Sequence, residues 1–540
     1  MVETWETLVA KKQAEAADKI PSAWRLPSEY TVDVSETSSL NVLDIPRRSG
    51  LLSEKQLEIT ETNDATSLLE KIRKQELSAY EVTEAFCIRA AIAQQLTCCL
   101  TETLFDRALN RAKELDDHLT KTGQVVGPLH GLPISFKDCF NIKGIPSTIG
   151  FTSFIKHGPV DHDSAIVEVL VNLGAIPYVK TNIPQTMMAA DSHNYVFGRT
   201  LNPHRLNLCA GGSSGGEGAL IAMRGSVLGV GTDIAGSIRI PGICDGTFSF
   251  KPTADRVPLG GQTGSGRAGL PGIRACAGPL AVSARDLELF MKLVTNSDPW
   301  RLDSSVISSP WREVKPKSTF RLGLIVEDSH FPIHPPVQRT LNEAVKKLEA
   351  AGHEIVALNP PSIRDALVLA FRMFAMDPEE TAFKHIAASG EPTIPALAST
   401  ALPHEYLEEE HLPPTIDSLY ELGAQRIQFK EKFRALITEA QVDAIVMPGY
   451  QGTAQPHDVF GFVPYTVLWN VMDYPASIVP FGKADKAADA PFVRDVYYKP
   501  PYKPDEIEGA PCCVQVVTRN MQDEELVNVT RAVADVLGSQ

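Results

Sequence analysis

Cysteine is scarce in this sequence, which has nine cysteines among 540 residues and no CxxC pair. The adjacent pairs Cys98-Cys99 and Cys512-Cys513 lack the spacing of zinc ligands. So small and odd a number excludes a disulfide scaffold and is typical of reduced thiols in an intracellular protein. We therefore expect a cytoplasmic protein without a structural metal.

Long apolar runs are also lacking. The most apolar stretches, such as 365–376 (DALVLAFRMFAM), are interrupted by charge or glycine within a dozen residues. A helix that spans a bilayer needs about 20 apolar residues, so no membrane span is expected. The first 20 residues mix charge throughout and contain no apolar core of a secretory signal.

Runs of basic residues are missing as well. The formal net charge is -15, and the densest basic clusters are short, such as the pairs Arg47-Arg48 and Lys346-Lys347. An acidic chain without a basic patch repels the phosphate backbone, so no nucleic acid partner is expected. The hydrophobic content of 43% and the charged content of 22% are those of a globular protein with a large core.

Strand and helix patterns alternate along the chain. Ser78 and Glu81 form a capping box at the start of one helix. Asp163 is the expected cap of another helix, which Gly174 ends. Buried strands are expected at 131–138, 175–180, 321–326, 353–358 and 442–449, and further helices at 337–352 and 418–440. This pattern predicts an α/β fold with a large, mostly parallel or mixed central sheet covered by helices on both faces.

The chain is expected to form one large domain with a peripheral start. Residues 1–60 hold one charged helix and a stretch punctuated by prolines. We expect this segment to be helical or extended and to pack on a single domain formed by residues 61–540.

Glycine is concentrated in residues 205–280, which contain GGSSGGEGA, GVGTDIAGSIRIPG and LGGQTGSGRAGLPG. Ordering so much glycine is costly, which indicates close backbone approach or amide nests and makes this the expected site of chemistry. GSGRAG (264–269) matches a dinucleotide fingerprint, but no strand precedes it and Pro271-Gly272 follow, so no nucleotide cofactor is expected. HGPVDHD (157–163) is better explained by a turn than by a metal site.

Two serine motifs lie in this segment. GGSSGG (211–216) fits the G-x-S-x-G elbow centred on Ser213 or on Ser214. An α/β-hydrolase would then need a later acid and histidine, and the candidates His404 and His457 stand in no telling context. The second motif, TDIAGSIR (232–239), places Ser237 after residues small enough for several N–H groups to converge as in an oxyanion hole.

A lysine completes the set of candidate groups. Lys137 ends the apolar strand pattern GLPISFKD. Burial disfavours the ammonium, lowers the pKa of a lysine and makes its amine available as a base. The alternative is an exposed lysine at a strand end that pairs with Asp138. The residues alone leave both interpretations open.

Taken together, the motifs resemble the amidase signature family, and in particular the fungal acetamidases and the fatty-acid amide hydrolases. GPLHGLPISFKD, YVKTNIPQTMM, GGSSGGEGALIAMRGSVLGVGTDIAGSIRIP and FKPT (250–253) stand in the order of that family, with Ser213 and Ser237 24 residues apart. The resemblance is strongest over residues 125–285. It continues more weakly to DYPAS (473–477) and GAPCCVQVV (509–517).

The resemblance implies the roles of individual residues. It implies Lys137 as base, Ser213 as bridge in a cis peptide bond, and Ser237 as the nucleophile that forms an acyl-enzyme. It also implies oxyanion binding by the amides of Ile234, Ala235, Gly236 and Ser237, a pocket position for Met187, and supporting roles for Ser214, Asp233 and Arg239, the last two as a buried ion pair. Ala235 and Asp245 depart from the family pattern, and Asp245 would alter loop packing or substrate preference.

The function implied is hydrolysis of a small aliphatic or aromatic primary amide, without a cofactor. Three alternatives stay open: an α/β-hydrolase that uses Ser213 or Ser214, an amidotransferase-type subunit that works in a complex, and a non-catalytic amide-binding relative. The expected partner is a small-molecule amide, and a homodimer is one option for the oligomeric state.

Overall fold

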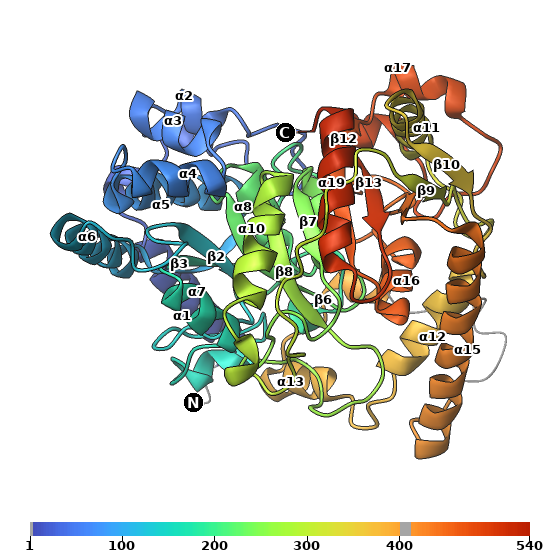
Figure 1. The fold of residues 1–540 in the computed structure, drawn as a ribbon. Coiled ribbons are helices and arrows are strands. Elements are labelled where there is room, and N and C mark those ends of the chain that lie inside the picture. The colour runs from blue at the N-terminus through green and yellow to red at the C-terminus, as the bar shows by residue number, and fades with distance from the viewer. Residues whose placement is uncertain (1–3, 400–411, 540) are drawn as a thin grey trace.

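A large mixed sheet forms the centre of the computed structural model, which describes residues 4–399 and 412–539 (Figure 1). The sheet has 11 strands in the spatial order β1 (Leu100–Thr103), β3 (Ile176–Thr181), β2 (Pro133–Lys137), β6 (Leu228–Asp233), β8 (Cys276–Ala281), β7 (Phe248–Lys251), β12 (Ala476–Lys483), β13 (Pro511–Val517), β11 (Ala444–Met447), β9 (Arg321–Leu324) and β10 (Glu354–Ala357). β2 runs parallel to β3 and β6, whereas β6 runs antiparallel to β8. The expected α/β fold with a mixed sheet is confirmed.

Helices cover both faces of the sheet. α10 (Ala284–Thr295) and α19 (Asp523–Leu537) lie in front of it in Figure 1 and contact β8 and β12. α8 (Gly215–Ala222) and α9 (Arg239–Asp245) contact each other and pack on the opposite face. The longer of the remaining helices are α1 (Trp5–Asp18), α3 (Glu54–Thr62), α4 (Ala65–Arg73), α5 (Ala79–Thr97), α6 (Phe105–Thr122), α7 (Ala165–Asn172), α11 (Pro335–Ala350), α12 (Ile363–Phe374), α13 (Thr381–Ser389), α15 (Ile416–Ala440) and α16 (Pro464–Met472).

Most expected elements are present at nearly the expected positions. The capping box of Ser78 and Glu81 begins α5, with the Glu81 amide 3.0 Å from Ser78 Oγ. α3 spans residue 60, where the peripheral first segment was expected to end. Its residues Leu57 and Ile59 are buried in the main core. Among the described residues, no helix has the length and apolar character that crossing a bilayer would need.

The expected cap of α7 is wrong. Ser164, not Asp163, occupies the N-cap position, and its Oγ accepts from Asn141 N at 2.8 Å. Asp163 Oδ1 accepts instead from Lys143 N at 2.7 Å. The loop after β2 therefore competes successfully for the carboxylate, which a reading of local sequence could not show. In the same segment His162 Nδ1 lies 2.8 Å from the exposed Asp161.

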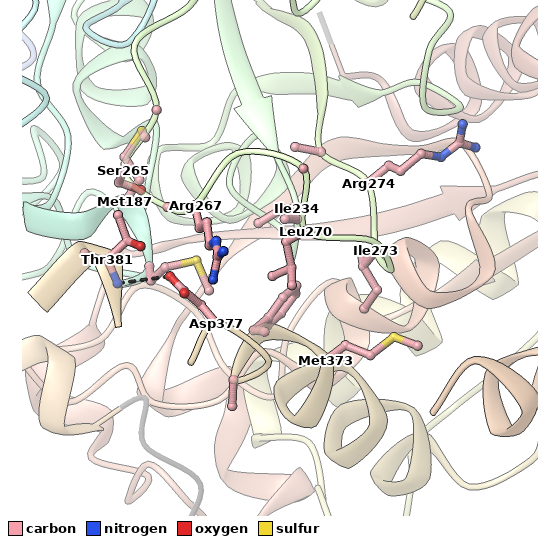
Figure 2. Close-up of a pocket in the computed structure, with 18 of the residues that line it drawn as sticks. Met187, Ile234, Ser265, Arg267, Leu270, Ile273, Arg274, Met373, Asp377 and Thr381 are labelled. Atoms are coloured by element: carbon pink, nitrogen blue, oxygen red, sulfur yellow. Dashed lines mark hydrogen bonds between the residues drawn. The ribbon is translucent and has the colours of Figure 1, made fainter. Parts of the chain in front are cut away.

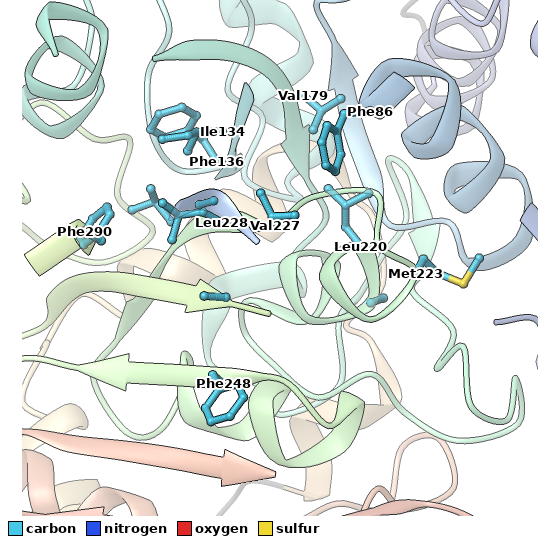
Figure 3. Close-up of a cluster of buried hydrophobic side chains, with 14 of the residues drawn as sticks. Phe86, Ile134, Phe136, Val179, Leu220, Met223, Val227, Leu228, Phe248 and Phe290 are labelled. Atoms are coloured by element: carbon cyan, nitrogen blue, oxygen red, sulfur yellow. The ribbon is translucent and has the colours of Figure 1, made fainter. Parts of the chain in front are cut away.

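The main core packs around the strands that carry the Gly-rich loops. Figure 3 shows Phe86, Phe136, Leu220, Leu228 and Phe290 converging from α5, α8, α10 and the sheet. Side chains alternate along a strand, so Phe136 faces away from Ser135 and Lys137, its neighbours on β2. Burial of Phe136 thus fixes the direction in which Lys137 points.

We expect Phe136→Ala to lower the free energy of unfolding by about 3–5 kcal/mol, because it leaves a cavity in a fully buried site. Urea denaturation followed by tryptophan fluorescence measures the loss. Phe383, whose exposed fraction is 50%, is the matched control, and Phe383→Ala is expected to change stability by at most about 0.5 kcal/mol. Equal effects of the two variants would contradict this account of the core.

Candidate active site

Lys137 is fully buried at the end of β2 and points to the Gly-rich loops. Its Nζ donates to Ser213 Oγ at 2.6 Å and to Thr232 Oγ1 at 2.8 Å. Within residues 4–399 and 412–539 no carboxylate oxygen lies within 4.0 Å of this Nζ. Asp138 pairs with Lys180 instead, at 3.4 Å. The interpretation of Lys137 as an exposed partner of Asp138 is therefore wrong.

Burial sets the proton affinity of this amine. Desolvation lowers the pKa of Lys137 from the ordinary lysine value to about 8. The two hydroxyl partners can accept hydrogen bonds from an ammonium, and they can also donate to a neutral amine. At pH 7 about a tenth of Lys137 is therefore uncharged, and this fraction grows as the pH rises toward 8.

Ser213 lies where the chain enters α8. The Gly212–Ser213 peptide bond is cis, as the resemblance implies for this position. A Cβ atom on Gly212 would lie 2.4 Å from the carbonyl oxygen of Ala189, so only glycine fits there. Ser214 follows as the N-cap residue of α8, and its amide donates to the carbonyl oxygen of Ser237 at 3.1 Å. This bond ties the two serine loops together.

A buried ion pair holds the loop of Ser237. Asp233 ends β6, and its Oδ1 and Oδ2 each lie 3.0 Å from the guanidinium of Arg239. Both side chains are fully buried. Burial alone would raise the pKa of Asp233, but the charge and hydrogen bonds of Arg239 lower it below its usual value. The ion pair that the sequence suggested is present.

Arg239 is itself anchored from a distant part of the chain. Its guanidinium donates to the carbonyl oxygen of Thr466, to Asn470 Oδ1 and to Gln515 Oε1, at 2.7–3.0 Å. α16 and β13 therefore position the loop between β6 and α9, although both lie more than 200 residues away in sequence.

The backbone amides of this loop divide into two groups. Gly236 N donates to Asp233 Oδ1 at 2.8 Å, so this amide, expected to face the substrate, is already engaged. The carboxylate three residues earlier captures it, as aspartates at turns commonly do. Among the described residues no acceptor lies within hydrogen-bond range of the amides of Ile234, Ala235 and Ser237. Those three amides are free to donate to a bound ligand.

A cavity of about 1040 Å³ opens in front of these groups. Ser213, Thr232 and Ser237 lie at one end of it, and no hydrogen bond joins the two serine hydroxyls within the described part of the chain. Much of the wall is apolar, with Met187, Ile234, Leu270, Ile273 and Met373 labelled in Figure 2. Met187 thus lies in the wall, as the resemblance implies.

Some lining residues had no signal in the sequence. Met373 comes from α12, far from the Gly-rich segment, and only the fold brings it to the cavity. Thr232, the second partner of Lys137, lies in the quoted motif TDIAGSIR and could have been noticed as a hydroxyl five residues before Ser237. A smaller pocket of about 30 Å³ adjoins Ser237 on the side of Ala190 and Phe371.

Other candidates lie away from the cavity wall. His457 Nε2 lies 3.0 Å from the carbonyl oxygen of Leu206, and His404 falls outside the described residues. Asp245 is buried at the end of α9, where burial raises the pKa of its carboxyl well above the usual value. It contributes to packing between α8 and α9, since a Cβ on Gly218 would lie 2.2 Å from its Oδ2.

Comparison with known proteins gives a consistent family. The amidase family model matches residues 81–527. The chain is 40% identical to an amidase of Gibberella moniliformis, over 99% of both chains, and 35% identical to an acetamidase of Emericella nidulans, over 100% of this chain and 99% of the relative. Its structure resembles that of a fatty acid amide hydrolase, with a TM-score of 0.89, 32% identity, and coverage of 98% of this chain and 95% of that chain.

We expect Asp233→Asn to reduce kcat by about 100-fold, because it releases the loop amides from their fixed positions. Removing one partner of a buried ion pair also lowers the free energy of unfolding by about 3–5 kcal/mol. Steady-state kinetics and urea denaturation measure the two effects. Asp161→Asn, at a side chain that is 97% exposed, is the control and should resemble the wild type. A variant at Asp233 with normal kcat would contradict this role for the ion pair.

Proposed function

This chain belongs to the amidase signature family and is an amide hydrolase, and we propose that it cleaves its substrates through a relay of Lys137, Ser213 and Ser237. The single observation that carries the proposal is the contact of 2.6 Å between Lys137 Nζ and Ser213 Oγ. The amine is buried, has no anionic partner within 4.0 Å among the described residues, and has a lowered pKa. These are the properties of a base rather than of a structural cation.

The proposed reaction is nucleophilic acyl transfer. Neutral Lys137 takes the proton of Ser213 Oγ while Ser213 takes the proton of Ser237 Oγ, and Ser237 Oγ bonds to the amide carbonyl carbon. Rotation of the Ser213 and Ser237 hydroxyls brings them within hydrogen-bond range for the proton transfer between them. Catalytic hydrogen bonds commonly tighten in this way only when substrate is bound. The amides of Ile234, Ala235 and Ser237 stabilise the oxyanion.

The intermediate then collapses. The relay returns the proton to the leaving nitrogen, the C–N bond breaks, and ammonia or an amine departs from an ester on Ser237. Water attacks this ester and gives its proton to the same relay. The C–O bond to Ser237 breaks as the relay returns that proton to Ser237 Oγ, and the carboxylic acid leaves and gives its remaining proton to solvent. No step needs a group other than those of the chain, the substrate and water.

The substrate is proposed to be an amide with an apolar acyl or aryl part. The names of the relatives, amidase and acetamidase, support the expected small aliphatic or aromatic primary amide. The cavity of about 1040 Å³, with much of its wall apolar, admits groups much larger than acetyl. Kinetics with primary amides of increasing acyl length, from acetamide upward, will locate the optimum.

The cellular setting is also a proposal. The nine cysteines are unpaired, as expected of a cytoplasmic enzyme. We propose that the protein acts there on small-molecule amides and not as part of an amidotransferase complex.

We expect Ser237→Ala and Lys137→Ala each to lower kcat by at least about 1,000-fold, because each removes a member of a relay that works as a unit. Release of ammonia from a primary amide measures turnover. Lys432→Ala, at an exposed lysine, is the control. A fluorophosphonate probe should label the wild type but not Ser237→Ala, and unchanged labelling would reject Ser237 as the nucleophile.

The pH dependence follows from the sign of the shift at Lys137. The neutral amine is the active form, so kcat/KM should rise with pH and level off above a midpoint near 8, where the pKa of Lys137 lies. A full profile of kcat/KM against pH measures the midpoint. A midpoint near 10, typical of an unperturbed lysine, would contradict the assigned base.

A further inference from the structure

A second buried acid lies behind the proposed relay. Glu217, on α8, has no exposed surface. Its Oε2 is 2.6 Å from Ser135 Oγ, and its Oε1 accepts from Thr181 Oγ1 at 2.9 Å. Ser135 lies two residues before Lys137 on β2, and Thr181 ends β3. One carboxyl group therefore links the helix that follows Ser213 to the strand that carries Lys137.

The contact between Glu217 and Ser135 depends on the lack of a side chain at Gly229. A Cβ on Gly229 of β6 would lie 2.0 Å from Glu217 Oε2 and 2.5 Å from Ser135 Oγ. Any larger residue at 229 would separate the two groups. β6, β2 and α8 therefore pack closely against the Glu217 carboxyl group at this point.

The hydroxyl chain next to Glu217 indicates where its proton lies. Ser135 Oγ lies 3.0 Å from Ser226 Oγ, and Ser226 donates to the carbonyl oxygen of Leu228 at 3.0 Å. A hydroxyl has a single proton to donate. Ser226 gives its proton to Leu228, so the bond between the two serines needs the proton of Ser135. The contact of 2.6 Å between Ser135 Oγ and Glu217 Oε2 is then a hydrogen bond only if Glu217 supplies the proton.

The surroundings of Glu217 favour the same protonation state. In the described part of the chain no cationic nitrogen lies within 4.0 Å of its carboxyl group. A buried carboxylate without a counter-ion is costly, and burial raises the pKa of Glu217 to about 7. The titratable groups that face it are Lys137 on β2, Tyr178 on β3 and Cys99 before β1.

We propose that Glu217 carries a proton in the acidic range, up to neutrality, and is a positioning residue for the relay. Its O–H donates to Ser135, its carbonyl oxygen accepts from Thr181, and these bonds fix β2 against α8 so that Lys137 and Ser213 stay in contact. Because Glu217 is uncharged, it places no anion behind Lys137 that would favour the ammonium. The positioning role rests on the proposed function, whereas the protonation state does not.

Two variants separate this role from the alternatives. Glu217→Gln keeps both hydrogen bonds without charge, since the amide can donate to Ser135 and accept from Thr181. We expect kcat of this variant at pH 6 to lie within about threefold of the wild type at the same pH. Glu217→Leu keeps a side chain of similar size but makes neither hydrogen bond. We expect its kcat to fall about 100-fold through misplacement of Lys137 and Ser213, whereas KM should change much less.

Each other outcome overturns the proposal. If Gln is as inactive as Leu at pH 6, an uncharged hydrogen-bonding group at position 217 is not what the relay needs, and the proposal fails. If Leu is as active as Gln, the residue only fills space.

Infrared spectroscopy tests the proton directly and does not depend on turnover. The wild type minus Glu217→Gln difference spectrum should contain the C=O stretch of one protonated carboxyl group at pH 6. A difference with only carboxylate bands overturns the proposal. This result stands even if Lys137→Ala retains activity, which would reject the relay itself, so the two failures can be told apart.

Discussion

The contact between the amine of Lys137 and the hydroxyl of Ser213 is the interaction on which the rest of the site depends. At 2.6 Å, in a fully buried position, the amine is close enough to exchange a proton and too poorly solvated to hold it firmly. An exposed lysine at the same distance would remain an ammonium at neutral pH. The fold must therefore bury Lys137 and still satisfy its hydrogen bonds. Two hydroxyls, those of Ser213 and Thr232, do this without supplying a charge.

The distribution of buried charge follows from that requirement. Around the nucleophile loop the protein places a full ion pair, Asp233 with Arg239, and anchors it from α16 and β13. Around Lys137, by contrast, it places hydroxyls, and the nearest part of α8 carries Glu217 without a counter-ion. The rigid ion pair fixes the backbone that meets the substrate. We propose that the hydroxyl partners of Lys137 allow its proton to move to and from Ser213.

Local patterns predicted the parts of the fold in which burial and periodicity agree. The strands at 131–138 and 175–180 and the capping box at Ser78 belong to this class, because each depends on residues close in sequence. The ion pair of Asp233 and Arg239 was instead implied by the family resemblance. The expected cap of α7 was wrong, because the Asp163 carboxylate accepts from Lys143 N instead. The bond from the Gly236 amide to the Asp233 carboxylate was likewise not visible in the local sequence. The cavity wall could not be predicted, because α12 reaches it only through tertiary packing. Glu217 stood in the quoted motif GGSSGGEGA, and a lone acid among small residues is a signal that the sequence offers.

The central claim is that burial lets the amine of Lys137 lose its proton near pH 8 rather than near pH 10. Nitrogen-15 NMR of protein labelled only at the lysine side chains measures this directly, with the Lys137 signal assigned by its loss in Lys137→Arg. The account predicts that this signal titrates with a midpoint near pH 8, the lowered pKa that burial gives Lys137. A signal that stays that of an ammonium up to pH 10 would contradict it.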